Sequence, residues 1–191
     1  MTDFWFFTQL GFKHVLDWQA YDHILFLMVL CLPYSVRAWR SLLWLVSLFT
    51  LGHTLSLILA SYELVLLPKH WIEFLIPVSI LIMAIKALIK PGKQQKQLSK
   101  ISSITTLFFG LIHGFGFASF FAMTVPDTKW MPLAGFAFGV ELAQALIVTV
   151  MVFAATVALH LTRIALRDWV LVVAGIVTGL TLPFLVENWI F

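Results

Sequence analysis

Apolar segments long enough to cross a lipid bilayer occupy most of this 191-residue chain. About 20 consecutive apolar residues form a helix that crosses the hydrocarbon core of a bilayer. A shorter apolar segment extends over about Tyr21–Tyr34. The long segments are about Leu42–Tyr62, Trp71–Ile89, Ile101–Ala122, Pro132–Leu159 and Trp169–Val186. The pattern predicts an integral, multi-pass membrane protein.

The composition favours helices over a membrane β-barrel. Apolar residues make up 61% of the chain and charged residues only 11%. A barrel strand would show alternating apolarity over about ten residues, whereas residues 145–157 are apolar on every face. We predict an all-α bundle of six transmembrane helices formed by residues 20–191, within a single transmembrane domain that comprises residues 1–191.

The first 18 residues have a different pattern. Gln9, Lys13 and Asp17 recur every four residues among aromatic and aliphatic side chains, which is the spacing of one helix face. Such a helix can lie flat, with its apolar face in the membrane interface. Residues 1–18 are therefore predicted to form a short interfacial amphipathic helix on the outer side of the membrane.

The basic residues predict the orientation of the chain, because Lys and Arg concentrate in cytoplasmic loops. The second and fourth loops between the predicted spans hold only Lys69 and Lys129. The other loops hold Arg37, Arg40, Lys86, Lys90, Lys93, Lys96, Lys100, Arg163 and Arg167. This asymmetry predicts that the chain lies in the cell (inner) membrane with both termini outside. The lysine-rich third loop has no aromatic residues among its charges, so we expect no nucleic-acid partner. The lipid bilayer is the expected partner, and a homo-oligomer is left open.

Ionisable side chains interrupt four of the apolar segments, at Asp22-His23, His53, His113 and Glu141. Each such residue costs roughly 2.5–3.5 kcal/mol on insertion scales, so it normally faces the bundle interior and marks function. All of them are metal-ligand or acid-base types. Imidazole and carboxylate without a thiolate cluster suit nickel, cobalt or zinc.

Helix geometry predicts that three of these residues meet. His53, His113 and Glu141 each lie nine residues from the outer end of their apolar segment, which is roughly 13–14 Å at 1.5 Å per residue. We therefore expect them near the membrane midplane. Gln144 lies one turn deeper than Glu141 on the same helix face. Asp22, His23 and Glu73 lie near the outer ends of their helices and are predicted to form the entrance to this midplane site.

Glycines four residues apart allow transmembrane helices to approach closely. Such pairs occur at Gly110/Gly114, Gly135/Gly139 and Gly175/Gly179. The first pair brackets His113 and the second precedes Glu141. We expect these two pairs to draw His113 and Glu141 together.

Short motifs follow one another along essentially the whole chain. They are residues 11–16 (GFKHVL), 21–27 (YDHILFL), 49–56 (FTLGHTLS), 72–73 (IE), 113–118 (HGFGFA) and 139–144 (GVELAQ). This ordered set resembles the HupE/UreJ family of nickel and cobalt permeases. The resemblance implies a six-helix bundle that admits a divalent transition metal ion as its substrate. It also implies a metal pathway through Asp22, His23, His53, His113 and Glu141.

One motif departs from the family pattern. The family usually places five residues between its first histidine and the Asp-His pair, whereas seven residues separate His14 from Asp22. His14 is therefore assigned an accessory role, as are Glu73 and Gln144.

The residues also permit two other functions. The first is an intramembrane zinc-dependent hydrolase, with His53, His113 and His23 or Asp22 as zinc ligands and Glu141 activating water. The second is a haem-binding protein with His53 and His113 as axial ligands. The chain has no Gly-x-x-x-x-Gly-Lys-Ser/Thr motif, so we expect no ATP-hydrolysing unit within it. We expect a permease driven by the membrane potential rather than an enzyme.

Overall fold

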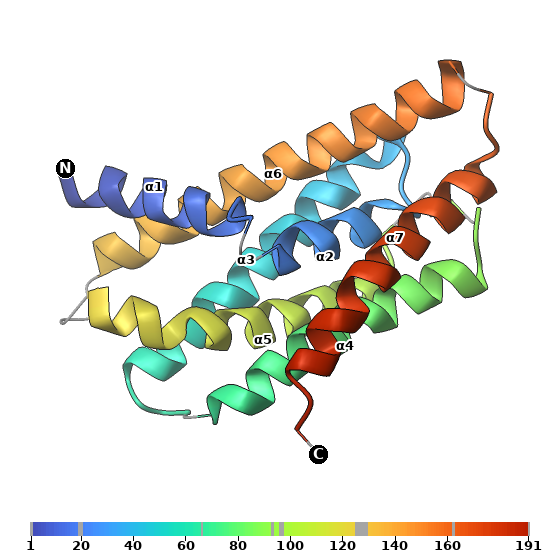
Figure 1. Cartoon of the computed structure of the whole chain (residues 1–191). Coiled ribbons are helices and arrows are strands. Elements are labelled where there is room, and N and C mark those ends of the chain that lie inside the picture. The colour runs from blue at the N-terminus through green and yellow to red at the C-terminus, as the bar shows by residue number, and fades with distance from the viewer. Residues whose placement is uncertain are drawn as a thin grey trace.

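The computed structural model describes residues 2–18, 21–65, 67–92, 94–95, 98–124, 130–161 and 163–190. In this part of the chain the secondary structure is entirely helical (Figure 1). The elements are α1 (Thr2–Val15), α2 (Asp22–Cys31), η1 (Val36–Ala38), α3 (Trp39–Ser61), α4 (Lys69–Ile89), α5 (Lys100–Thr124), α6 (Trp130–Leu161) and α7 (Leu166–Glu187).

Helices α3 to α7 are each long and apolar enough to cross a membrane. They confirm the prediction of an all-helical, multi-pass membrane protein. The sixth predicted span forms only the ten-residue helix α2, whose rise of about 15 Å is half of a ~30 Å hydrocarbon core. The predicted count of six transmembrane helices is therefore not confirmed.

The closest helix pair is α3 with α5, and glycines make its approach possible. A side-chain carbon added to Gly110 would collide with the carbonyl of Phe49, and one added to Gly114 would collide with His53 and Ser56. Residue numbers rise together along this contact, so the two helices run parallel. The contact therefore places His53 and His113 at the same level of the bundle.

A second close pair is α1 with α6. Gly135 lies against the carbonyl of Phe4, and Gly139 lies against the carbonyl of Thr8. Helix α1 therefore runs parallel to the first half of α6 (Figure 1). The prediction that residues 1–18 lie flat in the interface is not confirmed, because these glycines let α1 pack lengthwise against a membrane helix.

The two glycine pairs beside the polar residues thus have different partners from those expected. Gly110/Gly114 join α5 to α3, and Gly135/Gly139 join α6 to α1. Neither pair joins His113 to Glu141. Gly175 and Gly179 on α7 have no neighbouring atom within 4 Å of an added side-chain carbon.

Helix α2 occupies the centre of the bundle. Seven of its ten residues are buried, and it packs against α4, α6 and α7. Figure 1 shows α2 further along α6 than α1 and running in a similar direction. Helix α1 ends at Val15 and α2 begins at Asp22, and the described residues between them, 16–18 and 21, are not helical. We therefore describe α1 and α2 as a broken helix with Asp22 and His23 at the break.

The close helix approach predicts opposite effects of alanine at two glycines. Gly110→Ala should lower the melting temperature of the detergent-solubilised protein, because overpacking against the Phe49 carbonyl costs about 1–3 kcal/mol. Gly179→Ala should leave the temperature unchanged or raise it, since alanine favours a helix by about 1 kcal/mol over glycine and has open space there. Equal melting temperatures for the two variants would contradict the α3–α5 contact.

Candidate metal centre

Three histidines from three helices meet at the break between α1 and α2. One ring nitrogen from each of His14, His23 and His53 lies within 4.8 Å of the others. The His14 ring centroid lies 4.8 Å from that of His23 and 5.7 Å from that of His53. Ligand nitrogens around a tetrahedral ion with ~2.0–2.1 Å bonds are roughly 3.3 Å apart. Small side-chain rotations would therefore bring the three nitrogens into a shared coordination sphere.

The three histidines occupy different positions along their helices. His14 lies in the last turn of α1, His23 in the first turn of α2, and His53 in the interior of α3. The seven residues between His14 and Asp22 contain the end of α1 at Val15 and the described non-helical residues 16–18 and 21. Because the chain changes course there, the longer spacing does not remove His14 from the site. His14, assigned only an accessory role from the sequence, lies in the cluster itself.

Asp22 and His113 complete the surroundings of His23. The Asp22 carboxylate lies 3.1 Å from Nδ1 of His23 and 3.9 Å from Nε2 of His113. The ring centroids of His23 and His113 are 5.2 Å apart. A carboxylate in this position fixes the orientation of a histidine, a usual arrangement behind metal-binding imidazoles.

The hydrogen bonds of two rings define which nitrogen can bind an ion. His113 donates from Nδ1 to the carbonyl of Phe109 at 2.8 Å, because a carbonyl can only accept. The Nδ1 of His23 likewise faces a carboxylate. In both neutral rings the lone pair is therefore on Nε2.

The Nε2 atoms of the four histidines are buried and have no hydrogen-bond partner among the described residues. His23, His53 and His113 are only 1–2% exposed. Leaving a buried polar atom unpaired costs about 1–3 kcal/mol, so four together form a costly arrangement. A bound divalent cation would satisfy these lone pairs, and the residues present fit such an ion.

Phenylalanines surround the imidazoles. Phe117 and Phe136 lie 3.9 Å and 5.7 Å from the His14 ring by centroid. Phe49 lies 5.2 Å from the His113 ring and 5.0 Å from Phe26. Phe26, Phe49 and Phe136 are almost completely buried. These rings exclude water and strengthen electrostatic attraction between the site and a cation.

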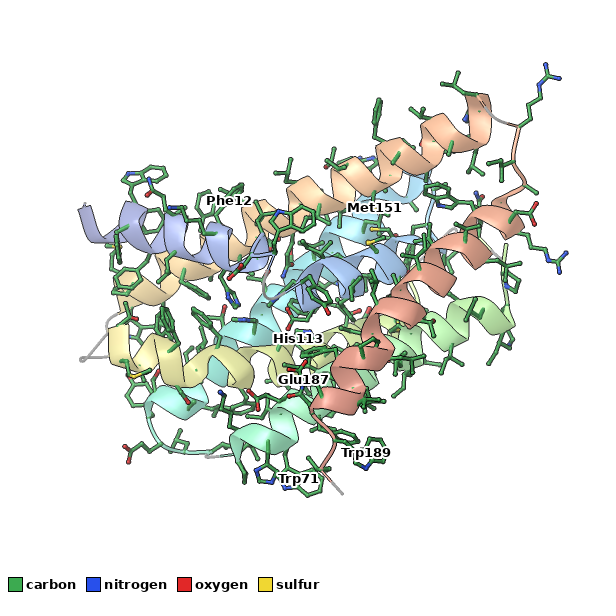
Figure 2. All side chains as sticks on the ribbon, viewed as in Figure 1. Phe12, Trp71, His113, Met151, Glu187 and Trp189 are labelled. Atoms are coloured by element: carbon green, nitrogen blue, oxygen red, sulfur yellow. The ribbon has the colours of Figure 1, made fainter. Side chains whose placement is uncertain are left out.

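A cavity of about 1070 Å³, hereafter the vestibule, leads to the cluster. Its inner wall includes His14, Asp22, His23 and His113. The carboxyl-terminal end of α7 and the start of α4 line the same cavity (Figure 2). His14, His23 and His113 therefore border a cavity that extends to the end of α7, whereas His53 does not line it.

Carboxylates from separate elements line the vestibule. Asp17, Glu73 and Glu187 belong to the segment after α1, to α4 and to the end of α7. Glu73 also pairs with Lys69 at 3.1 Å, where both side chains are well exposed. Sequence reasoning missed Glu187. The sequence feature that could have identified this residue is its negative charge at the carboxyl end of a helix, where the helix dipole disfavours such a charge.

The structure does not bring Glu141 to the imidazoles. Its Oε1 accepts a hydrogen bond from Ser47 at 2.6 Å, in a partly exposed position between α3 and α6. The hydroxyl of Thr50 lies 3.4 Å from the fully buried Gln144. These two pairs lie further along α6 than Phe136, which contacts the cluster. The expected trio of His53, His113 and Glu141 is replaced by the four histidines with Asp22.

The fold and the site together define a multi-pass helical membrane protein with a buried, imidazole-rich site suited to a divalent metal ion. A family model described as HupE / UreJ protein matches residues 1–188. The chain therefore belongs to the HupE/UreJ family, whose members are membrane proteins related to nickel and cobalt transport. No curated protein and no solved structure matches the chain.

Removal of one imidazole should weaken metal binding strongly. His14→Ala, His23→Ala and His53→Ala should each lower the affinity for nickel or cobalt by at least about tenfold, since even residues behind the ligands contribute 10–100-fold. His70→Ala provides a control, because His70 is exposed at the start of α4. Binding should also weaken as the pH falls through the range in which imidazole takes up a proton, because protons compete with the ion.

Titration calorimetry of the purified proteins measures both effects. Equal affinities for the control and the three cluster variants would contradict the site.

Proposed function

We propose that this protein is a permease for a divalent transition metal ion, nickel or cobalt, with zinc as a further candidate. The observation that carries the proposal is the set of four buried Nε2 atoms that have no partner in the described part of the chain. Three of these histidines, His14, His23 and His113, line the vestibule together with four carboxylate residues. Nitrogen-rich sites suit these ions. Membership of the HupE/UreJ family supports transport over catalysis.

In this proposal α1 and α2 together make the first of six membrane passes. The 14 residues of α1 and the 10 of α2 rise about 36 Å in total, enough for a ~30 Å core. Broken helices are where transporters commonly place ion sites. With the distribution of basic residues, this gives both termini outside and the vestibule open to the outside.

The ion enters through the vestibule. Asp17, Glu73 and Glu187 attract the hydrated cation electrostatically. Asp22 then replaces part of its water shell and hands it to the imidazoles. Asp22 also keeps a negative charge beside His23 and His113, which favours a bound cation.

The Phe26 and Phe49 rings separate the histidines from the opposite side of the membrane. Beyond them, the pairs Ser47–Glu141 and Thr50–Gln144 offer oxygen atoms between α3 and α6. We assign Glu141 and Gln144 to the inner part of the pathway. Nickel and cobalt prefer imidazole to these oxygens, so the ion is held less tightly there and is released.

The membrane potential can drive this uptake. Two positive charges moving inward gain about 4.6 kcal/mol per 100 mV, which corresponds to accumulation on the order of a thousandfold. No nucleotide hydrolysis is required.

The geometry is less suited to the two other functions. In a zinc hydrolase Glu141 would activate a metal-bound water, but it pairs with Ser47 away from the cluster. Axial haem ligands need a porphyrin between them. The His23 ring lies 5.9 Å from His53 and 5.2 Å from His113, so a third imidazole lies close to both proposed axial ligands, which favours a small cation over a haem.

Uptake by reconstituted vesicles tests the proposed function. Wild-type protein should admit nickel or cobalt under an inside-negative potential, and the flux should collapse when potassium and valinomycin remove that potential. Glu141→Gln should keep the fold, because the amide still accepts from Ser47, but should reduce the flux. Vesicles that take up no nickel, cobalt or zinc under an imposed potential would count against the permease.

Charge at the vestibule should affect capture more than turnover. Glu187→Gln should raise the metal concentration for half-maximal uptake more than it lowers the maximal rate, and high salt should reduce the difference. Asp168→Asn is the matched control, since it removes the same charge from the other end of α7. If both variants behave alike, the carboxylates of the vestibule do not act as a capture site.

A further inference from the structure

A second cavity lies near the opposite end of the bundle from the mouth of the vestibule. It has a volume of about 240 Å³ and is bounded by α2, α4, the segment that follows α4, α5 and α7. Apolar residues such as Val29, Leu30, Met83 and Val170 line it, while Lys86 and Lys90 are its cationic residues. An apolar wall with adjacent ammonium groups matches an amphiphile with an anionic head.

The two lysines are arranged as a pair. They lie four residues apart at the end of α4, hence on one face of the helix. Both side chains are exposed. Neither has a carboxylate within 4.0 Å among the described residues, where the only lysine ion pair is that of Lys69 with Glu73.

Other groups near the cavity reinforce its affinity for an anion. The turn at Gly92 lies against Arg167, whose backbone and Cβ would be about 3.4 Å from a side-chain carbon on that glycine. The Tyr34 hydroxyl donates to Oε1 of Gln95 at 2.9 Å, which leaves the amide nitrogen of Gln95 as a donor. Tyr34 and Gln95 both line the cavity.

The chain itself supplies little negative charge at this end. Seven described basic residues lie in the segments that end or begin here, namely Arg37, Arg40, Lys86, Lys90, Lys100, Arg163 and Arg167. The acidic residue in these segments and the adjoining helix starts is Asp168, which does not line the cavity. An anion from outside the protein is therefore needed to balance Lys86 and Lys90 when membrane surrounds them.

We propose that this cavity binds an anionic phospholipid of the adjacent leaflet. The phosphate lies between Lys86 and Lys90, and the first part of an acyl chain packs against Val29, Leu30 and Met83. A volume of about 240 Å³ is below the roughly 300–1,000 Å³ of sites that enclose a whole drug-sized ligand. The cavity therefore holds the headgroup region and leaves the acyl tails in the bilayer. Basic pockets between transmembrane helices bind anionic lipids in this way.

Native mass spectrometry of the purified protein tests the proposal without requiring transport. Protein mixed with phosphatidylglycerol and phosphatidylcholine of identical acyl chains should prefer phosphatidylglycerol. The double variant Lys86→Gln/Lys90→Gln should lose a factor of roughly ten to thirty in that preference, the effect of two basic side chains near an anionic headgroup. The control Arg40→Gln/Lys100→Gln removes the same charge from residues that do not line the cavity and should retain the preference.

A second variant separates a shaped site from diffuse charge. Ala87→Phe fills the cavity, which Ala87 lines, but keeps both lysines, and should also lower phosphatidylglycerol binding. Circular dichroism and thermal unfolding confirm that each variant is folded. The proposal is overturned if wild-type protein shows no preference, if the control loses it equally, or if Ala87→Phe binds normally. Competition by inorganic phosphate as effective as that by the lipid would show an ion site and reject the phospholipid.

Discussion

The central constraint in this protein is a set of four buried imidazole nitrogens that have no hydrogen-bond partner among the residues that the structure describes. Each lone pair costs free energy unless a donor or a cation meets it. The hydrogen bonds from His113 to Phe109 and between His23 and Asp22 fix the lone pairs on Nε2. The structure therefore maintains an arrangement that only a ligand can stabilise fully. A divalent cation is the simplest ligand that can meet several imidazoles at once.

Glycines and a helix break make this arrangement possible. Gly110 and Gly114 bring α5 against α3, which places His113 beside His53. Gly135 and Gly139 bring α1 against α6, which carries His14 into the bundle. The interruption between α1 and α2 then positions His23 next to His14. Small residues thus contribute to the site without contacting an ion.

Part of the site could be predicted from the sequence. Equal distance from the helix ends placed His53 and His113 at one level, because helical rise is regular. The position of His14 depended on how α1 and α2 are placed relative to each other, which residue spacing cannot define. The direction of the Glu141 side chain could not be predicted, because it depends on how α6 is rotated about its own axis. In the structure this rotation turns the carboxylate to Ser47. The place of Glu187 in the vestibule could not be predicted either, because it depends on where the end of α7 lies in the folded bundle.

The two ends of the bundle have different chemistry. Four carboxylate residues and one lysine, Lys13, line the vestibule, whereas two lysines and no carboxylate line the cavity at the other end. The Phe26 and Phe49 rings lie between the histidines and that second end. In the proposed pathway a cation is attracted from one side and held by nitrogen atoms at the centre. The positive charge at the opposite end suits an anionic leaflet.

The most direct test of this account is X-ray absorption spectroscopy of the nickel- or cobalt-loaded protein. The account predicts a first shell containing at least three nitrogen ligands at about 2.0–2.1 Å, with the outer-shell scattering that imidazole rings produce. His14→Ala should reduce the imidazole contribution by one ring. A spectrum with oxygen ligands alone, and without imidazole scattering in the wild-type protein, would contradict the histidine site.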